Sequence, residues 1–212
     1  MPIVFLHGLG QKPGDWDPVI NRLDKGSRTL CPNLHALERD GEDYPALYGA
    51  FERYCDGLEE QLDLCGLSLG GVLALQYAAE HPERVNSLAL IGARASMPKA
   101  LLKFQKLLFR VMPAESFGKM GLEKQSAIQL CTSMAELDLR PVLEQITCPA
   151  LVLCGEKDRA NRHAAEKLGR MLPNGEVRLI AEGGHEANRD APEALSVLLA
   201  DFYKRHAAVQ NT

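Results

Sequence analysis

Residues 61–80 read Gln-Leu-Asp-Leu-Cys-Gly-Leu-Ser-Leu-Gly-Gly-Val-Leu-Ala-Leu-Gln-Tyr-Ala-Ala-Glu, and this stretch decides the fold. An apolar run leads into Gly66-Leu67-Ser68-Leu69-Gly70, and a segment with helical character follows at once. This order of strand, tight turn with a serine at its tip, and helix is the nucleophile-elbow pattern. Such a turn leaves no room for a Cβ two residues before or after the serine, and glycine meets that demand at both positions. The alternative is an ordinary strand–helix turn in which the pentapeptide arose by chance.

The composition is that of a soluble globular protein. The chain has 212 residues, of which 46% are hydrophobic and 25% charged, and this length suits a single domain. The net charge of −4 gives no electrostatic footprint for nucleic acid. No apolar run approaches the length of a membrane span, and residues 1–8 read as a strand rather than a signal peptide. We therefore expect a cytoplasmic protein without nucleic-acid or membrane partners.

The cysteines give no indication of a metal site. The chain contains no Cys-x-x-Cys, and several cysteines lie in apolar, strand-like runs, where free thiols behave as small hydrophobes. The six are Cys31, Cys55, Cys65, Cys131, Cys148 and Cys154. We expect them to be reduced, and we expect neither a metal nor a cofactor.

Short apolar runs alternate with helical patterns along most of the chain. The runs predict strands near residues 3–6, 29–32, 62–65, 85–91, 150–154 and 177–181. Helices are expected over 15–25, 44–58, the segment after the elbow to about Glu80, 159–172 and 191–206. This alternation predicts an α/β fold with a mostly parallel sheet and helices on both faces. Only residues 93–146 read as helices alone, and we interpret them as an insertion in one domain spanning 1–212.

Chemistry-bearing residues follow four of the predicted strands. In open parallel sheets, ligands bind beyond the carboxyl ends of the strands. Ser68 lies at one such end, and the others carry His7-Gly8-Leu9-Gly10, Gly155-Glu156-Lys157-Asp158 and Glu182-Gly183-Gly184-His185. A serine, an acid, a histidine and a glycine-rich loop should therefore meet at one edge of the sheet.

With these motifs, the chain resembles the α/β-hydrolase superfamily over nearly its whole length, the helical insertion excepted. The resemblance implies Ser68 as nucleophile, His185 as general base and Asp158 as the acid that orients the histidine. It also implies an oxyanion hole formed by the backbone N–H groups of Leu9 and Leu69. The family's usual N-terminal hairpin is missing, because the chain begins at the strand that normally comes third.

Each of these residues has a plainer interpretation. Asp158 could serve only as the cap of the helix that follows, and Glu156 competes with it as the acid. His185 could be a solvated loop histidine, although the two glycines before it suggest a close approach. His7 is expected to be structural, holding the donor loop. The other histidines are expected at the surface: His35, His81, His163 and His206.

The insertion occupies the place of the family's cap over the active site. Residues 97–112 combine one narrow charged stripe (Lys99, Lys103, Lys106, Arg110) with a wide apolar face. A helix buried on two sides would explain this pattern. So would a lid with an apolar substrate pocket beneath it, or a basic helix lying on an anionic membrane.

In the lid interpretation, the candidate substrate contacts are Phe104, Leu108 and Met112. A second stretch, Leu122–Leu137, is expected to form the other arm of the cap.

The sequence thus predicts a serine hydrolase, most simply a carboxylesterase with an acyl-enzyme on Ser68. The apolar cap and the lack of clustered arginines at the strand ends favour a small, largely apolar ester, thioester or lactone as its substrate. Two alternatives remain open: a C–C bond hydrolase or lyase on the same fold, and a non-catalytic ligand-binding protein on that scaffold. The sequence does not determine the oligomeric state.

Overall fold

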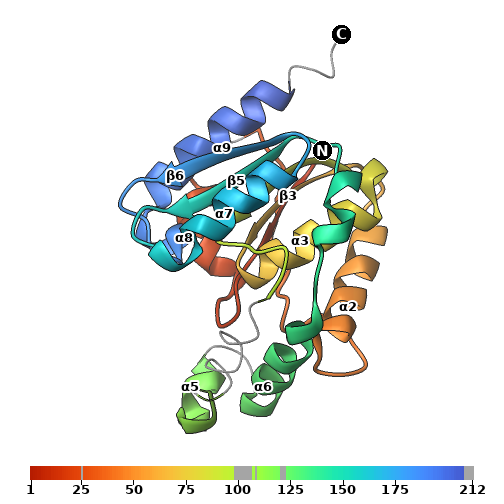
Figure 1. Cartoon of the computed structure of the whole chain (residues 1–212), viewed down its shortest axis with the longest axis vertical. Coiled ribbons are helices and arrows are strands. Elements are labelled where there is room, and N and C mark those ends of the chain that lie inside the picture. Colours follow the sequence, from red (N-terminus) through yellow and green to blue (C-terminus); the bar gives the residue numbers. More distant parts are fainter. Residues whose placement is uncertain (25, 98–106, 108, 120–122, 208–212) are drawn as a thin grey trace.

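The structure is a computed structural model that describes residues 1–24, 26–97, 107, 109–119 and 123–207 (Figure 1). Its strands are β1 (Ile3–Leu6), β2 (Thr29–Leu30), β3 (Leu62–Leu67), β4 (Val85–Ile91), β5 (Ala150–Gly155) and β6 (Gly175–Ile180). They form one sheet in the order β2-β1-β3-β4-β5-β6, and every pairing is parallel. The predicted six-stranded sheet is therefore confirmed.

Helices cover both faces of this sheet. One face carries α2 (Tyr44–Asp56), α3 (Leu69–Glu80) and α7 (Arg159–Met171), and the other carries α1 (Asp17–Ile20) and α9 (Pro192–Ala207). Successive strand residues point to opposite faces, so a strand covered on both faces must be apolar throughout. Strand β1 shows this directly, because Val4 and Leu6 enter one core while Ile3 and Phe5 enter the other.

The first predicted helix is wrong in its extent. Residues 15–25 were expected to be helical, whereas the structure has a 3₁₀ turn, η1 (Pro13–Trp16), followed by the single-turn helix α1. Pro18 lies in the first turn of α1, where its missing N–H is tolerated. Beyond Ile20 the chain continues in tighter turns, with the Arg22 N–H bonded to Val19 O at 3.0 Å and the Leu23 N–H to Ile20 O at 3.1 Å. Asp15 is not the cap of a long helix; it accepts the Lys12 N–H at 2.7 Å and pairs with Arg189 at 2.8 Å.

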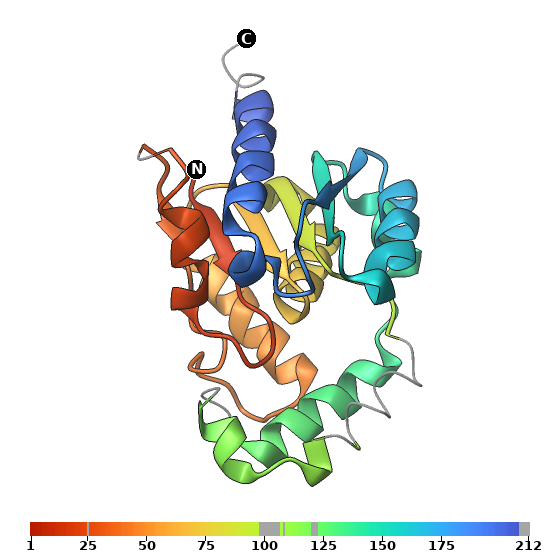
Figure 2. The ribbon, with the colours of Figure 1, turned by 90° about the vertical axis from the view of Figure 1, so that its left-hand side faces the viewer.

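The insertion is helical, as predicted. Its described helices are α5 (Ala114–Lys119), α6 (Lys124–Ser133), and the 3₁₀ turns η3 (Met134–Glu136) and η4 (Arg140–Gln145). Figures 1 and 2 show α5 and α6, in green, together at one end of the molecule beyond the sheet. The two segments that connect this insertion to the sheet lie side by side. Ser96 and Asp138 form an isolated antiparallel β-bridge, and the Leu139 N–H donates to the Ala95 carbonyl at 2.7 Å.

Remaining short elements are η2 (Pro82–Arg84) before β4 and α8 (Ala187–Asp190) before α9. Among the described residues, no helix is both long and apolar enough to cross a membrane.

Candidate active site

The turn between β3 and α3 holds Ser68 in a strained conformation. Its φ of 52° and ψ of −112° are unfavourable for a side chain, and the turn is possible only because glycines stand two residues before and two residues after the serine. A Cβ on Gly66 would lie 2.3 Å from the Gly70 carbonyl oxygen, and one on Gly70 would lie 2.2 Å from the Leu6 oxygen. The predicted steric reason for both glycines is thus confirmed. Ser68 sits half-buried at the start of α3, where the helix dipole favours negative charge.

Beyond β5 and β6, the structure brings Asp158 and His185 together. His185 Nδ1 lies 2.8 Å from Asp158 Oδ2, and the Asp158 side chain is only 6% exposed. Asp158 also caps α7, since its other oxygen accepts the Asn161 N–H at 3.3 Å, so this side chain contacts His185 and caps the helix at the same time. Glu156 points elsewhere: it is exposed and accepts the Glu182 N–H at 3.1 Å.

Residues at the end of β4 link the serine to this pair. The Ser68 N–H donates to the Ile91 carbonyl at 2.8 Å, and Gly92 follows directly. Gly92 has a φ of +58°, and a Cβ there would lie 3.1 Å from both Cε1 and Nδ1 of His185. Ser68 and His185 therefore flank the same two residues at the carboxyl edge of the sheet. No hydrogen bond joins their side chains in the described part of the chain.

The loop after β1 is held by His7. This histidine is fully buried, and its Nε2 accepts the Leu34 N–H at 3.1 Å while Nδ1 lies 3.0 Å from the Gly8 oxygen. The geometry therefore places the proton on Nδ1, which donates to that carbonyl. Burial lowers the pKa of His7, which keeps the ring neutral. The predicted structural role of His7 is confirmed.

Two buried amides also hold this loop, and sequence reasoning missed both. Gln11 Oε1 accepts the Gly8 N–H at 3.1 Å, and Gln11 Nε2 donates to Asn188 Oδ1 at 3.0 Å. These two side chains are 177 positions apart, and no local pattern marks either one. Neither the Leu9 nor the Leu69 N–H bonds to another backbone group in the described part of the chain, so both donors remain available.

A third missed residue, Asn161, contacts the acid and the histidine at once. Its Nδ2 donates to Asp158 Oδ2 at 2.7 Å and lies 3.1 Å from His185 Nδ1. Its Oδ1 accepts from Arg94 Nε at 2.8 Å, which fixes the orientation of the amide. The spacing of three residues from Asp158, typical of a helix start, was the available signal.

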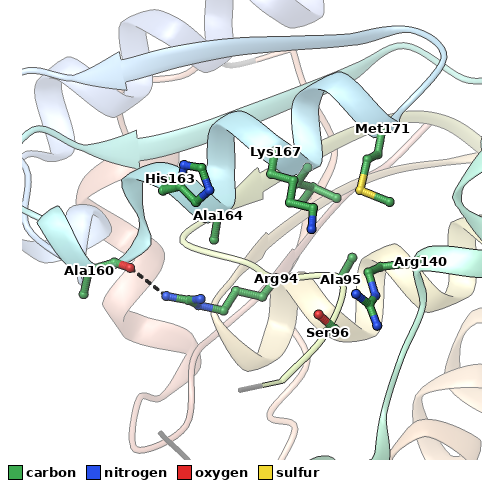
Figure 3. A pocket seen from close by; sticks show the side chains of 10 residues that line it. Arg94, Ala95, Ser96, Arg140, Ala160, His163, Ala164, Lys167 and Met171 are labelled. Atoms are coloured by element: carbon green, nitrogen blue, oxygen red, sulfur yellow. Dashed lines mark hydrogen bonds between the residues drawn. The ribbon is translucent and has the colours of Figure 1, made fainter. Parts of the chain in front are cut away.

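We expected no cluster of arginines at the strand ends, and the structure shows that this is wrong. Arg94 follows β4 closely, and its side chain shares a pocket with Arg140 and Lys167 (Figure 3). Arg140 is brought there by the returning connection of the insertion, 46 positions further along the sequence, which is why the cluster was not visible in the sequence.

His35 was expected at the surface, and this is wrong. Its ring lies half-buried with its centroid 4.9 Å from that of His7, and its Nε2 is buried without a hydrogen-bond partner among the described residues. Burial lowers the pKa of His35 to about 4. His163 is exposed as predicted, whereas His81 and His206 are half-buried.

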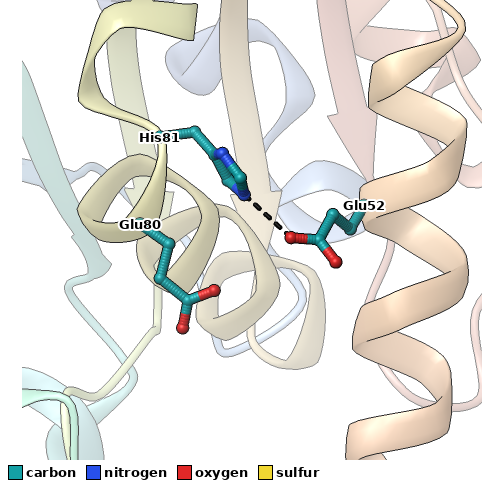
Figure 4. A group of neighbouring side chains, drawn as sticks. All are labelled: Glu52, Glu80 and His81. Carbon is teal, nitrogen blue, oxygen red and sulfur yellow. Dashed lines mark hydrogen bonds and ion pairs between the residues drawn. The ribbon is translucent and has the colours of Figure 1, made fainter.

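One group of side chains has the composition of a metal site (Figure 4). Ligand atoms of Glu52, Glu80 and His81 lie within 4.8 Å of one another. These ligand atoms already have hydrogen-bond partners. His81 Nε2 bonds Glu52 at 2.9 Å, and Glu80 accepts hydrogen bonds from Tyr48 and Gln76. They also lie at the far end of α3 from Ser68, about 18 Å along the helix axis. This group is therefore separate from the candidate active site.

The predicted substrate contacts on the cap are only partly described. Phe104 and Leu108 lie outside the described residues. Met112 is half-buried, and its carbonyl accepts from Lys124 Nζ at 2.8 Å. No contact of Met112 with Ser68 or His185 is found in the described structure. The stretch expected to form the second arm holds α6 and η3, and a Tyr44 N–H to Ser133 Oγ bond of 2.7 Å joins α6 to α2.

Known proteins resemble this chain in sequence and in fold. The model of the alpha/beta hydrolase family matches residues 3–196. An AB hydrolase superfamily protein of Bacillus subtilis, YisY, is 28% identical over 243 residues, which cover 95% of this chain and 91% of that protein. A pimeloyl-[acyl-carrier protein] methyl ester esterase of Nitrosomonas europaea is 27% identical over 230 residues, covering 90% and 91%.

Among solved structures, the enol-lactonase of Burkholderia xenovorans superposes with a TM-score of 0.81 at 21% identity, covering 96% of this chain and 91% of that one. This likeness concerns the fold. Together with the family match over most of the chain, it leads to one conclusion. The chain belongs to the alpha/beta hydrolase family.

Proposed function

We propose that this protein is a serine hydrolase that cleaves a small carboxylic ester through an acyl-enzyme on Ser68. The observation that carries the proposal is the His185–Asp158 bond of 2.8 Å at the same sheet edge as the strained Ser68 turn. An activated serine needs a base beside it and a third group that orients the base. In this structure Asp158, the group that would orient the base, is already hydrogen-bonded to His185.

The bond to Asp158 assigns the roles of the two imidazole nitrogens. A neutral His185 that donates from Nδ1 has its lone pair on Nε2, and that nitrogen can remove the Ser68 proton. The serine oxygen then attacks the ester carbonyl, while Asp158 stabilises the imidazolium. The Leu9 and Leu69 N–H groups, which are free of backbone partners, would bind the oxyanion.

The imidazolium next returns its proton to the leaving alcohol, which departs and leaves an acyl group on Ser68. Water repeats the attack with His185 as base, and the acid product and the free serine are regenerated. The Asn161 amide supports both halves of this cycle, because it holds the Asp158 oxygen that faces His185.

Similarity to the methyl ester esterase of Nitrosomonas europaea supports an ester as the substrate class. We place the substrate between the sheet edge and the insertion of residues 93–146, which acts as a cap within the single domain 1–212. In this arrangement Phe104, Leu108 and Met112 contribute to an apolar wall. We also propose a cytoplasmic location, because all six cysteines are unpaired, as is usual in a reducing compartment.

Two assays test the proposed function: covalent labelling by a fluorophosphonate probe, and the rate of hydrolysis of short p-nitrophenyl esters. We expect the wild type to be labelled and to turn over the esters, and Ser68→Ala to lose both properties. Ser126→Ala is the matched control, because Ser126 is a buried serine of α6 outside the site. A wild type that folds but neither labels nor hydrolyses any ester would contradict the proposal and favour a binding protein on the same scaffold.

A further inference from the structure

A second site lies where the insertion joins the sheet. A pocket of about 270 Å³ opens between α7 and the two connecting segments, and its lining includes Arg94, Arg140 and Lys167. In Figure 3 the Lys167 ammonium and the Arg140 guanidinium reach into the same space, while the Arg94 guanidinium turns towards the Ala160 carbonyl at one side of it. Since one water occupies about 30 Å³ of liquid, this volume holds a group of several heavy atoms.

The charge of this pocket is only partly balanced. Arg140 pairs with Asp138 through two bonds of 2.7 and 2.5 Å, and the same carboxylate lies within electrostatic reach of Lys167. Within the described residues, the hydrogen-bond partners of Arg94 are neutral: the Asn161 Oδ1 at 2.8 Å and the Ala160 carbonyl at 2.7 Å. The described lining thus holds three permanent cations and no carboxylate, in a chain whose net charge is −4.

Helix α7 forms the remaining wall of the pocket, and two of its lining residues are alanines, which occupy little space. The lining residues recur at helical spacing, and two of them, Ala160 and Ala164, are small. Lys167 lies one turn beyond Ala164 on this face and has no carboxylate partner in the described part of the chain. Planar guanidinium groups and an ammonium around an open space are the donors that bind carboxylate or phosphate oxygens.

From this arrangement we propose that the pocket binds a small oxyanion, a carboxylate or a phosphate group. The expected source is the far end of the ester substrate, and this part of the inference rests on the proposed function. Arg94 lines the pocket and also bonds Asn161, which contacts Asp158 and His185. Asn161 thus links the pocket to the Asp158–His185 pair, and in our proposal a substrate with its ester at Ser68 places its anionic end here.

Direct binding tests the pocket without catalysis. Inorganic phosphate and glutarate are titrated into the full chain carrying Ser68→Ala, by calorimetry. We expect binding that weakens about tenfold in Lys167→Gln, the usual effect of losing a charge-assisted bond. The control is Arg170→Gln, an exposed cation on the same helix outside the pocket lining. Equal affinities in the two variants, or no binding of either anion, would overturn the proposal.

Kinetics then distinguish the two sources of the oxyanion. The half methyl ester of a dicarboxylic acid is compared with a neutral methyl ester of equal chain length. If the substrate carries the anion, KM for the half ester rises about tenfold in Lys167→Gln, while the neutral ester is unaffected. If a free anion occupies the pocket, phosphate binds as predicted but the half ester has no advantage, and the substrate assignment fails. Phosphate binding without hydrolysis of either ester would refute the proposed function and leave the pocket intact.

Discussion

The Gly92→Ala substitution is the sharpest test of the site geometry. Gly92 has a φ of +58°, and an alanine held there costs about 1–2 kcal/mol of unfolding free energy. Its Cβ would lie 3.1 Å from the His185 ring, where ordinary contacts begin at 3.4 Å, so the ring must move away from residue 92 by about 0.3 Å. With a loss of about 100-fold per Å of misplacement, a shift of about 0.3 Å lowers kcat/KM roughly fourfold.

Two other glycines separate backbone strain from ring displacement. Gly41 also has a positive φ, of +128°. A Cβ added there would lie 3.4 Å from the Ala46 side chain, and His185 is not among the residues it would approach. Gly118→Ala meets no atom within 4 Å. We expect Gly41→Ala to lower the melting temperature without changing kcat/KM, and Gly118→Ala to change neither by much.

The assay combines thermal unfolding with initial rates on a p-nitrophenyl ester. Each kcal/mol lost should lower the melting temperature by roughly 2–4 °C for a chain of this length. A Gly92→Ala variant with a reduced melting temperature but wild-type kcat/KM would refute the reasoning, because it would show that the position of the His185 ring does not limit the reaction.

Three further outcomes follow from the described contacts. Asn161→Leu removes the 2.7 Å bond to Asp158, and we expect kcat to fall about 10- to 100-fold with little change in KM. Burial lowers the pKa of His35 to about 4 in the folded protein, against 6.5 in the unfolded chain, so wild-type stability falls as the pH drops from 6.5 towards 4. His35→Leu should reduce this loss of stability, measured by urea unfolding at several pH values. Gln11→Leu leaves buried partners such as Asn188 unpaired and should cost about 1–3 kcal/mol in urea unfolding at pH 7. These expectations would be contradicted by an unchanged kcat in Asn161→Leu, by an unchanged pH dependence of stability in His35→Leu, or by an unchanged urea midpoint in Gln11→Leu.

The sheet and the positions of Ser68, Asp158 and His185 could be predicted because their signals are local. Apolar runs mark strands that are buried on both faces, and parallel strands bring their carboxyl ends to one edge. The first helix was predicted too long because the apolar spacing continues past Ile20, where the chain passes into i→i+3 turns. The glycines of the elbow were explained by a steric argument that needs only the neighbouring residues.

The order of the elements and the residues at their ends could thus be inferred from local sequence patterns. Which distant side chains meet depends on tertiary packing. Gln11 finds Asn188 across 177 positions, and Arg94 reaches Asn161 across 67. Arg140 joins the cationic pocket only because the insertion returns beside the strand it left. Such pairings depend on how helices and connections pack on the sheet, and packing contacts between residues far apart in the chain leave no periodic or local pattern in the sequence.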